Sequence, residues 1–89
     1  MRILLHIPGY WQRETSGILR PAVEAYLRHE ALTAEQLATM RAYLRQWIAA
    51  PAWQGEGVEA LRQAVDCITS QAALDAWIAK AVAEGVDPL

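Results

Sequence analysis

Residues 32–37, LTAEQL, mark the start of a helix and decide how the chain divides into elements. Thr33 and Gln36 have the spacing of a capping box, in which each side chain accepts a hydrogen bond from the other residue's backbone N–H. The leucines on either side of them form a hydrophobic staple. We therefore expect a helix over 34–50, which ends there because Pro51 cannot continue it. Its apolar residues recur at helical spacing: Leu37, Met40, Leu44, Trp47 and Ile48.

Similar signals on both sides of this helix predict three more. Pro21 is of the type favoured at the first helical position, and an apolar stripe follows it. Residues 51–57 contain proline and glycine and are expected to form a loop. Ser70 or Thr69 can cap the last helix, and Gly85 is expected to end it. The expected helices span residues 21–30, 34–50, 58–68 and 71–84.

Residues 1–19 have a different pattern, which we interpret as an extended or hairpin segment. Residues 2–7, RILLHI, place Ile3, Leu5 and Ile7 on one side, as a short strand does. Residues 10–19, YWQRETSGIL, place a polar turn ending in Gly17 between apolar flanks. The expected fold is mainly α: one domain over residues 1–89, a small four-helix bundle with a short extended or hairpin N-terminal segment.

Composition excludes several broad classes of protein. The chain is 54% hydrophobic and 20% charged, which suits a folded core, and its net charge of −2 gives no basic field for an anionic partner. No apolar run reaches the roughly 18–20 residues of a membrane span. Cys67 is the single cysteine, so no intrachain disulfide is possible. We expect a cytoplasmic protein, with no membrane association, and the Arg- and Ala-rich composition favours a bacterial or phage origin.

The sequence contains no recognisable catalytic or metal-binding motif. His6 and His29 are the only histidines, and neither has a second ligand at helical spacing. A single cysteine cannot form a structural zinc site, and Cys67 is expected to be a small buried residue. The glycines at 55 and 57 lack the lysine of a phosphate-binding loop. We therefore expect no enzyme activity, no catalytic residue, no metal and no cofactor.

Aromatic residues outside the expected helices are the best candidates for binding. Tyr10 and Trp11 fall in the expected hairpin, and Trp53 falls in the loop after Pro51. Large aromatic residues in loops either plug the core or anchor a protein interface. We predict a non-catalytic protein–protein interaction module or accessory subunit. A homodimer is expected as well, because residues 2–7 leave an unpaired strand edge and helix 58–68 has a wide apolar arc.

Two alternatives remain open. The two helices around residue 32, with Arg41 and Arg45 on the second, resemble a helix-turn-helix in outline and suggest a small nucleic-acid-binding regulator. Phosphate binding needs several aligned cations, however, so nucleic acid is not the favoured partner. The other alternative is the subunit of an enzyme whose active site is shared between chains.

Overall fold

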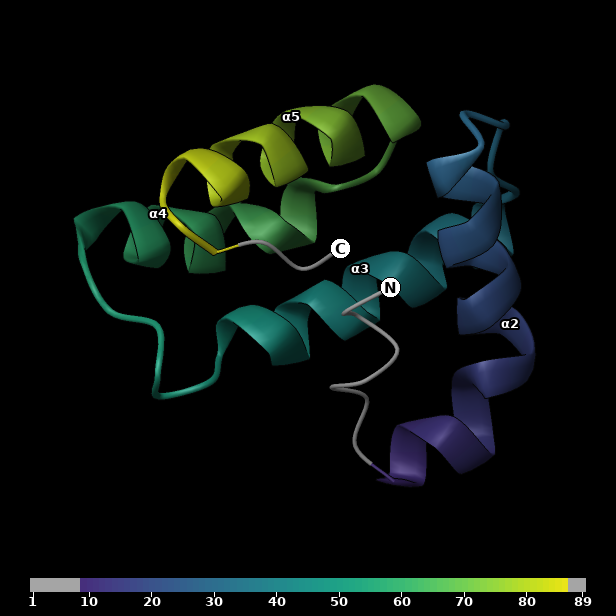
Figure 1. The fold of residues 1–89 in the computed structure, drawn as a ribbon. Coiled ribbons are helices and arrows are strands. Elements are labelled where there is room, and N and C mark those ends of the chain that lie inside the picture. Colours follow the sequence, from purple (N-terminus) through teal and green to yellow (C-terminus); the bar gives the residue numbers. More distant parts are fainter. Residues whose placement is uncertain (1–8, 87–89) are drawn as a thin grey trace.

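The computed structural model describes the backbone of residues 9–86 and the side chains of residues 17–86. This part of the chain is mainly α-helical and has no strand. Its elements are α2 (Gly9–Leu27), α3 (Ala34–Ile48), α4 (Glu56–Ala64), the 3₁₀ helix η1 (Val65–Cys67) and α5 (Gln71–Ala83). α2 packs on α3, α5 packs on α4, and both α4 and η1 contact α3 (Figure 1).

The predicted starts of two helices are confirmed by their caps. Thr33 Oγ1 accepts a hydrogen bond from Gln36 N at 3.1 Å, and Gln36 Oε1 accepts one from Thr33 N at 3.0 Å. Ser70 caps α5 in the same way, because its Oγ accepts from Ala73 N at 3.1 Å. These bonds satisfy backbone donors that have no partner within the first turn of a helix.

The predicted hairpin over residues 10–19 is wrong, because α2 begins at Gly9 and passes through Pro21. A proline inside a helix removes one hydrogen bond and crowds the carbonyl four residues earlier, which here belongs to Gly17. The apolar period nevertheless continues across the proline: Leu19 is fully buried, as is Val23. Burial of Leu19 on this face favours the helical course over a turn. The axis of α2 bends between its purple and blue parts (Figure 1).

The predicted strand over residues 2–7 lies outside the described residues. The third predicted helix, 58–68, is present in a changed form. It begins two residues earlier, at Glu56, and its last turn tightens into η1 at Val65. This change of pitch leaves Cys67 exposed rather than buried as expected, so the apolar arc of the helix is narrower than its sequence indicates.

One apolar core joins all the described helices. Trp77 lies within it, 4% exposed, and its indole Nε1 donates to Leu61 O at 3.1 Å, so its polar atom is satisfied. The buried residues of the core are Leu19, Ala22, Val23, Met40, Tyr43, Leu44, Ile48, Val58, Leu61, Val65, Ile68, Leu74, Trp77, Ile78, Ala81 and Val86.

Both α2 and α5 end in a Schellman motif. At the end of α2, Glu30 N donates to Ala25 O at 2.9 Å and His29 N donates to Tyr26 O at 3.0 Å. His29 is the residue with positive φ, at 61°. At the end of α5, the predicted stop at Gly85 is confirmed: its φ is 80°, and the following Val86 is buried. α2 is therefore followed by a non-glycine residue, His29, in the left-handed backbone conformation that glycine adopts with least strain.

Candidate functional site

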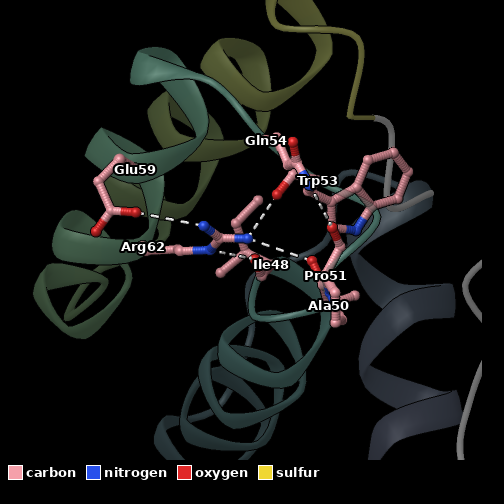
Figure 2. A network of polar contacts seen from close by, with 7 residues as sticks. All are labelled: Ile48, Ala50, Pro51, Trp53, Gln54, Glu59 and Arg62. Atoms are coloured by element: carbon pink, nitrogen blue, oxygen red, sulfur yellow. Dashed lines mark hydrogen bonds and ion pairs between the residues drawn. The ribbon is translucent and has the colours of Figure 1, made fainter.

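The loop over residues 49–55, here called the Trp53 loop, is fastened to α4 by one arginine. Arg62 Nε donates to Ile48 O at 2.8 Å, and its Nη2 donates to Ala50 O at 3.2 Å and to Trp53 O at 2.7 Å (Figure 2). The last carbonyls of a helix have no intrahelical donors, and the negative end of the helix dipole lies there. A planar guanidinium with five donors suits this position.

Further contacts hold the same loop in one conformation. Arg62 Nη1 donates to Oε2 of Glu59, on the same helix, at 3.3 Å. Within the loop, Trp53 N donates to Ala50 O at 3.1 Å, and Gln54 Nε2 lies 3.4 Å from Pro51 O. The side chain of Arg62 is 29% exposed, so these contacts lie at the edge of the core. The backbone of the loop is therefore fixed at both of its ends.

Trp53 projects from this loop on the side away from Arg62 (Figure 2). Its side chain has intermediate exposure and packs against the core. The Trp53 ring lies 5.6 Å from the ring of Trp47, at an angle of 41°, and Trp47 in turn stacks on Tyr43 at 6.2 Å. Trp53 is thus the outer member of an aromatic row that leads from buried Tyr43 to the surface. It covers the core with one part of the indole and presents another part to the surface.

The other two aromatic candidates, Tyr10 and Trp11, lie in the first turn of α2. They are helical residues, not hairpin residues as expected. Their side chains lie outside the described part of the chain, so their role as binding residues stays a prediction.

The two arginines of the nucleic-acid hypothesis both bind the turn around η1. Arg41 Nη1 donates to Ile68 O at 2.9 Å. Arg45 Nε donates to Asp66 Oδ1 at 2.9 Å, and its Nη2 contacts the same oxygen. These contacts join α3 to the 3₁₀ turn, so both guanidinium groups donate hydrogen bonds to residues of the same chain. The side chain of Arg45 remains 58% exposed.

A second group of polar side chains surrounds a hollow at the end of α2 and the start of α5, here called the α2–α5 hollow. It has a volume of about 350 Å³ and is lined by Tyr26, His29, Gln71 and Asp75. Tyr26 Oη donates to Asp75 Oδ1 at 2.6 Å, which joins the two helices. Burial, with the hydrogen bond and the negative charge of Asp75, raises the pKa of Tyr26 well above its usual value. The phenol therefore stays protonated at neutral pH.

Gln71 fixes the chain segment that leads away from α2. Its Nε2 donates to Glu30 O at 2.9 Å, and its Oε1 accepts from Leu32 N at 2.9 Å. The amide thus replaces two backbone hydrogen bonds in the link between α2 and α3. Residues 17–86 contain no group of three or more His, Cys, Asp or Glu residues that could hold a metal ion. No helix in residues 9–86 is long and apolar enough to cross a bilayer.

The sequence indicates neither Arg62 nor the α2–α5 hollow. The carbonyl partners of Arg62 are 9 to 14 residues away, and the partners of Gln71 and Tyr26 are 39 to 49 residues away. A pattern within one helix cannot reveal such contacts. A weak signal was present for Tyr26, which stood on an apolar stripe although it carries a hydroxyl that needs a partner when partly buried.

Comparisons with protein families, with curated proteins and with solved structures find no match to this chain. The function is therefore argued from the described residues alone.

Proposed function

We propose that the protein is a non-catalytic interaction module or accessory subunit that docks a protein partner through the Trp53 loop. The observation that carries this proposal is the fixed loop with a tryptophan at its surface. Tryptophan is enriched among the residues that dominate the affinity of protein interfaces. A loop already held by Arg62 loses little conformational freedom when a partner binds, so more of the contact energy appears as affinity.

The α2–α5 hollow supports a binding role rather than a catalytic one. A phenol whose pKa is raised is a poor base and a poor nucleophile at neutral pH, so Tyr26 is suited to donate a hydrogen bond. Its hydroxyl is already directed at Asp75. The proposed setting is the cytoplasm of a bacterial cell, or of one infected by a phage.

The test of the Trp53 loop is co-purification from the source cell with tagged wild type and two variants. Trp53→Ala removes the proposed anchor, and Val82→Ala is the matched control, because Val82 is an apolar residue on α5 that is 51% exposed. We expect quantitative mass spectrometry to show at least one protein that is recovered with wild type and Val82→Ala and lost with Trp53→Ala. Equal recovery of every protein with all three would remove Trp53 from the proposal. Circular dichroism shows whether each variant is folded.

A homodimer is the simplest form of such an assembly, and we propose it here as the partner arrangement. Light scattering on a gel-filtered sample measures it directly. We expect a mass of about twice the 9.9 kDa of the chain at high micromolar concentration. A mass near that of one chain would contradict the homodimer and leave a different partner for the Trp53 loop.

A further inference from the structure

We propose that the α2–α5 hollow binds a cationic N–H group, an ammonium or a guanidinium, with Asp75 as its counter-ion. This inference is independent of the Trp53 loop. The hollow lies at the start of α3 and the loop lies at its end, and a helix of 15 residues is about 22 Å long.

The hydrogen-bonding groups of the hollow are mostly acceptors. Asp75 is exposed, and among residues 17–86 its carboxylate accepts one hydrogen bond, from Tyr26 at Oδ1. A carboxylate can accept about four hydrogen bonds, so Oδ2 retains its full capacity. Tyr26 donates its hydroxyl proton to Asp75, so the hydroxyl oxygen can only accept a hydrogen bond from a further partner. A ligand that donates several N–H groups is the complement of this arrangement.

Among the described residues, the hollow has one carboxylate in its lining, that of Asp75, and no lysine or arginine. Asp75 forms no ion pair there, whereas Asp66 is paired with Arg45 and Glu59 is paired with Arg62. Arg28, on the adjoining end of α2, is directed at Glu30 at 3.1 and 3.2 Å. A cation from outside the chain would complete the charge balance in this place.

The walls of the hollow are fixed before any ligand arrives. The 2.6 Å bond between Tyr26 and Asp75 joins α2 to α5, and Gln71 holds the chain on both sides of residue 31. His29, which lines the hollow, is kept in a left-handed backbone conformation that few residues other than glycine adopt. Residues with backbone strain of this kind are concentrated at functional sites. A volume of about 350 Å³ is several times that of a water molecule and accommodates a guanidinium head with its last methylenes.

The cationic group can come from a lysine or arginine of a partner protein or from a free small cation. The test is an NMR titration of the full chain with three probes: N-acetyl-arginine methylamide, its neutral isostere N-acetyl-citrulline methylamide, and methylguanidinium. We expect the Gln71 side-chain amide and the backbone of His29 to shift with the arginine probe. The citrulline probe should bind at least about tenfold more weakly, because it lacks the charge.

Two variants assign the binding to the hollow. Asp75→Asn removes the charge but leaves an oxygen that can accept from Tyr26, and it should abolish the shifts. Asp66→Asn removes another exposed carboxylate, on η1, and should leave the shifts unchanged. Tighter binding of the arginine probe than of methylguanidinium assigns the site to a protein residue, and the reverse order assigns it to a small cation; either order supports the proposal.

Equal binding of the citrulline and arginine probes would overturn the proposal, and so would full retention of the shifts in Asp75→Asn. The comparison of the two probes on the wild-type protein stands by itself if Asp75→Asn fails to fold. The co-purification with Trp53→Ala is unaffected by either result, so failure here is separate from failure of the proposed docking loop.

Discussion

At the scale of single residues, His29 is the non-glycine residue with positive φ in the described part of the chain. Its φ of 61° suits glycine, and a side chain in that region is destabilised by about 1–2 kcal/mol. We expect His29→Gly to raise the free energy of unfolding by about 1 kcal/mol, measured by urea denaturation. His29→Ala is the control, because alanine keeps a Cβ and should bring no gain. If both variants stabilised the protein equally, the side chain rather than the backbone would be the source of the strain.

Arg62 is expected to contribute more to the free energy of unfolding than an arginine whose contacts are exposed on the surface. We expect Arg62→Met to lower the free energy of unfolding by about 1–3 kcal/mol, because it removes the side-chain donor of the Ile48 and Trp53 carbonyls and one of the two donors to Ala50 O. Arg45→Met removes a pair that is exposed on both sides and should lower it by less than about 1 kcal/mol. Denaturation curves of the two variants, measured side by side, test this order. Equal losses would contradict the role of Arg62 at the end of α3.

The distance between partners along the chain decides which of these residues can be predicted from sequence. The capping box of Thr33 and Gln36 is readable because its partners are three residues apart and bond to each other's backbone. Arg62 has nothing in its neighbourhood that points to the carbonyls of the preceding helix. Trp53 lies between these cases: its position in a loop is evident, but its packing on Trp47 depends on how that loop closes.

At the scale of elements, α2 is the helix whose start the sequence predicted wrongly. Pro21 has the properties of a first helical residue and Gly17 those of a turn residue, and both are also tolerated inside a helix whose buried face is strong enough. The helices 34–50 and 71–84, which carry side-chain caps, agree with α3 and α5 to within two residues at each end. A capping residue fixes a helix end through a hydrogen bond from its side chain, whereas proline and glycine only make a helix end possible at their position.

The helical course of α2 can be tested with a pair of glycine substitutions. Gly17 is helical with negative φ, and a Cβ added there meets nothing within 4 Å. We expect Gly17→Ala to raise the free energy of unfolding by about 0.5–1 kcal/mol through helix propensity. Gly85→Ala should lower it, because φ at Gly85 is 80°. Destabilisation by Gly17→Ala, measured by thermal or urea unfolding, would favour the turn that the sequence suggested.

At the scale of the whole molecule, buried Tyr43 and partly buried Tyr26 make stability depend on alkaline pH. Burial raises the pKa of Tyr43, which is 2% exposed, above that of an unfolded tyrosine, about 10. The unfolded chain therefore releases this proton first. Stability is fully present below pH about 10 and falls above it, by up to about 1.4 kcal/mol per pH unit for each such tyrosine.

We expect Tyr43→Phe to reduce the slope of this decline in urea denaturation between pH 9 and 11. Loss of the hydroxyl group itself lowers the free energy of unfolding by the same amount at every pH. The slope of the free energy against pH therefore still reports the titration of the tyrosine. An unchanged slope would mean that Tyr43 ionises as readily in the folded protein as in the unfolded one.

The contacts of Arg62 also set an order of events in folding. Its hydrogen bonds to the Trp53 loop and to Ile48 O close segments of only 9 to 14 residues, whereas Tyr26 and Gln71 join residues 39 to 49 positions apart. Closing a ten-residue loop takes about 10–100 ns, and longer loops lose more chain entropy before any contact compensates them. We therefore expect the contact between α3 and α4 to form first and the contact between α2 and α5 to form last. In stopped-flow experiments Arg62→Met should slow refolding, while Tyr26→Phe should mainly accelerate unfolding.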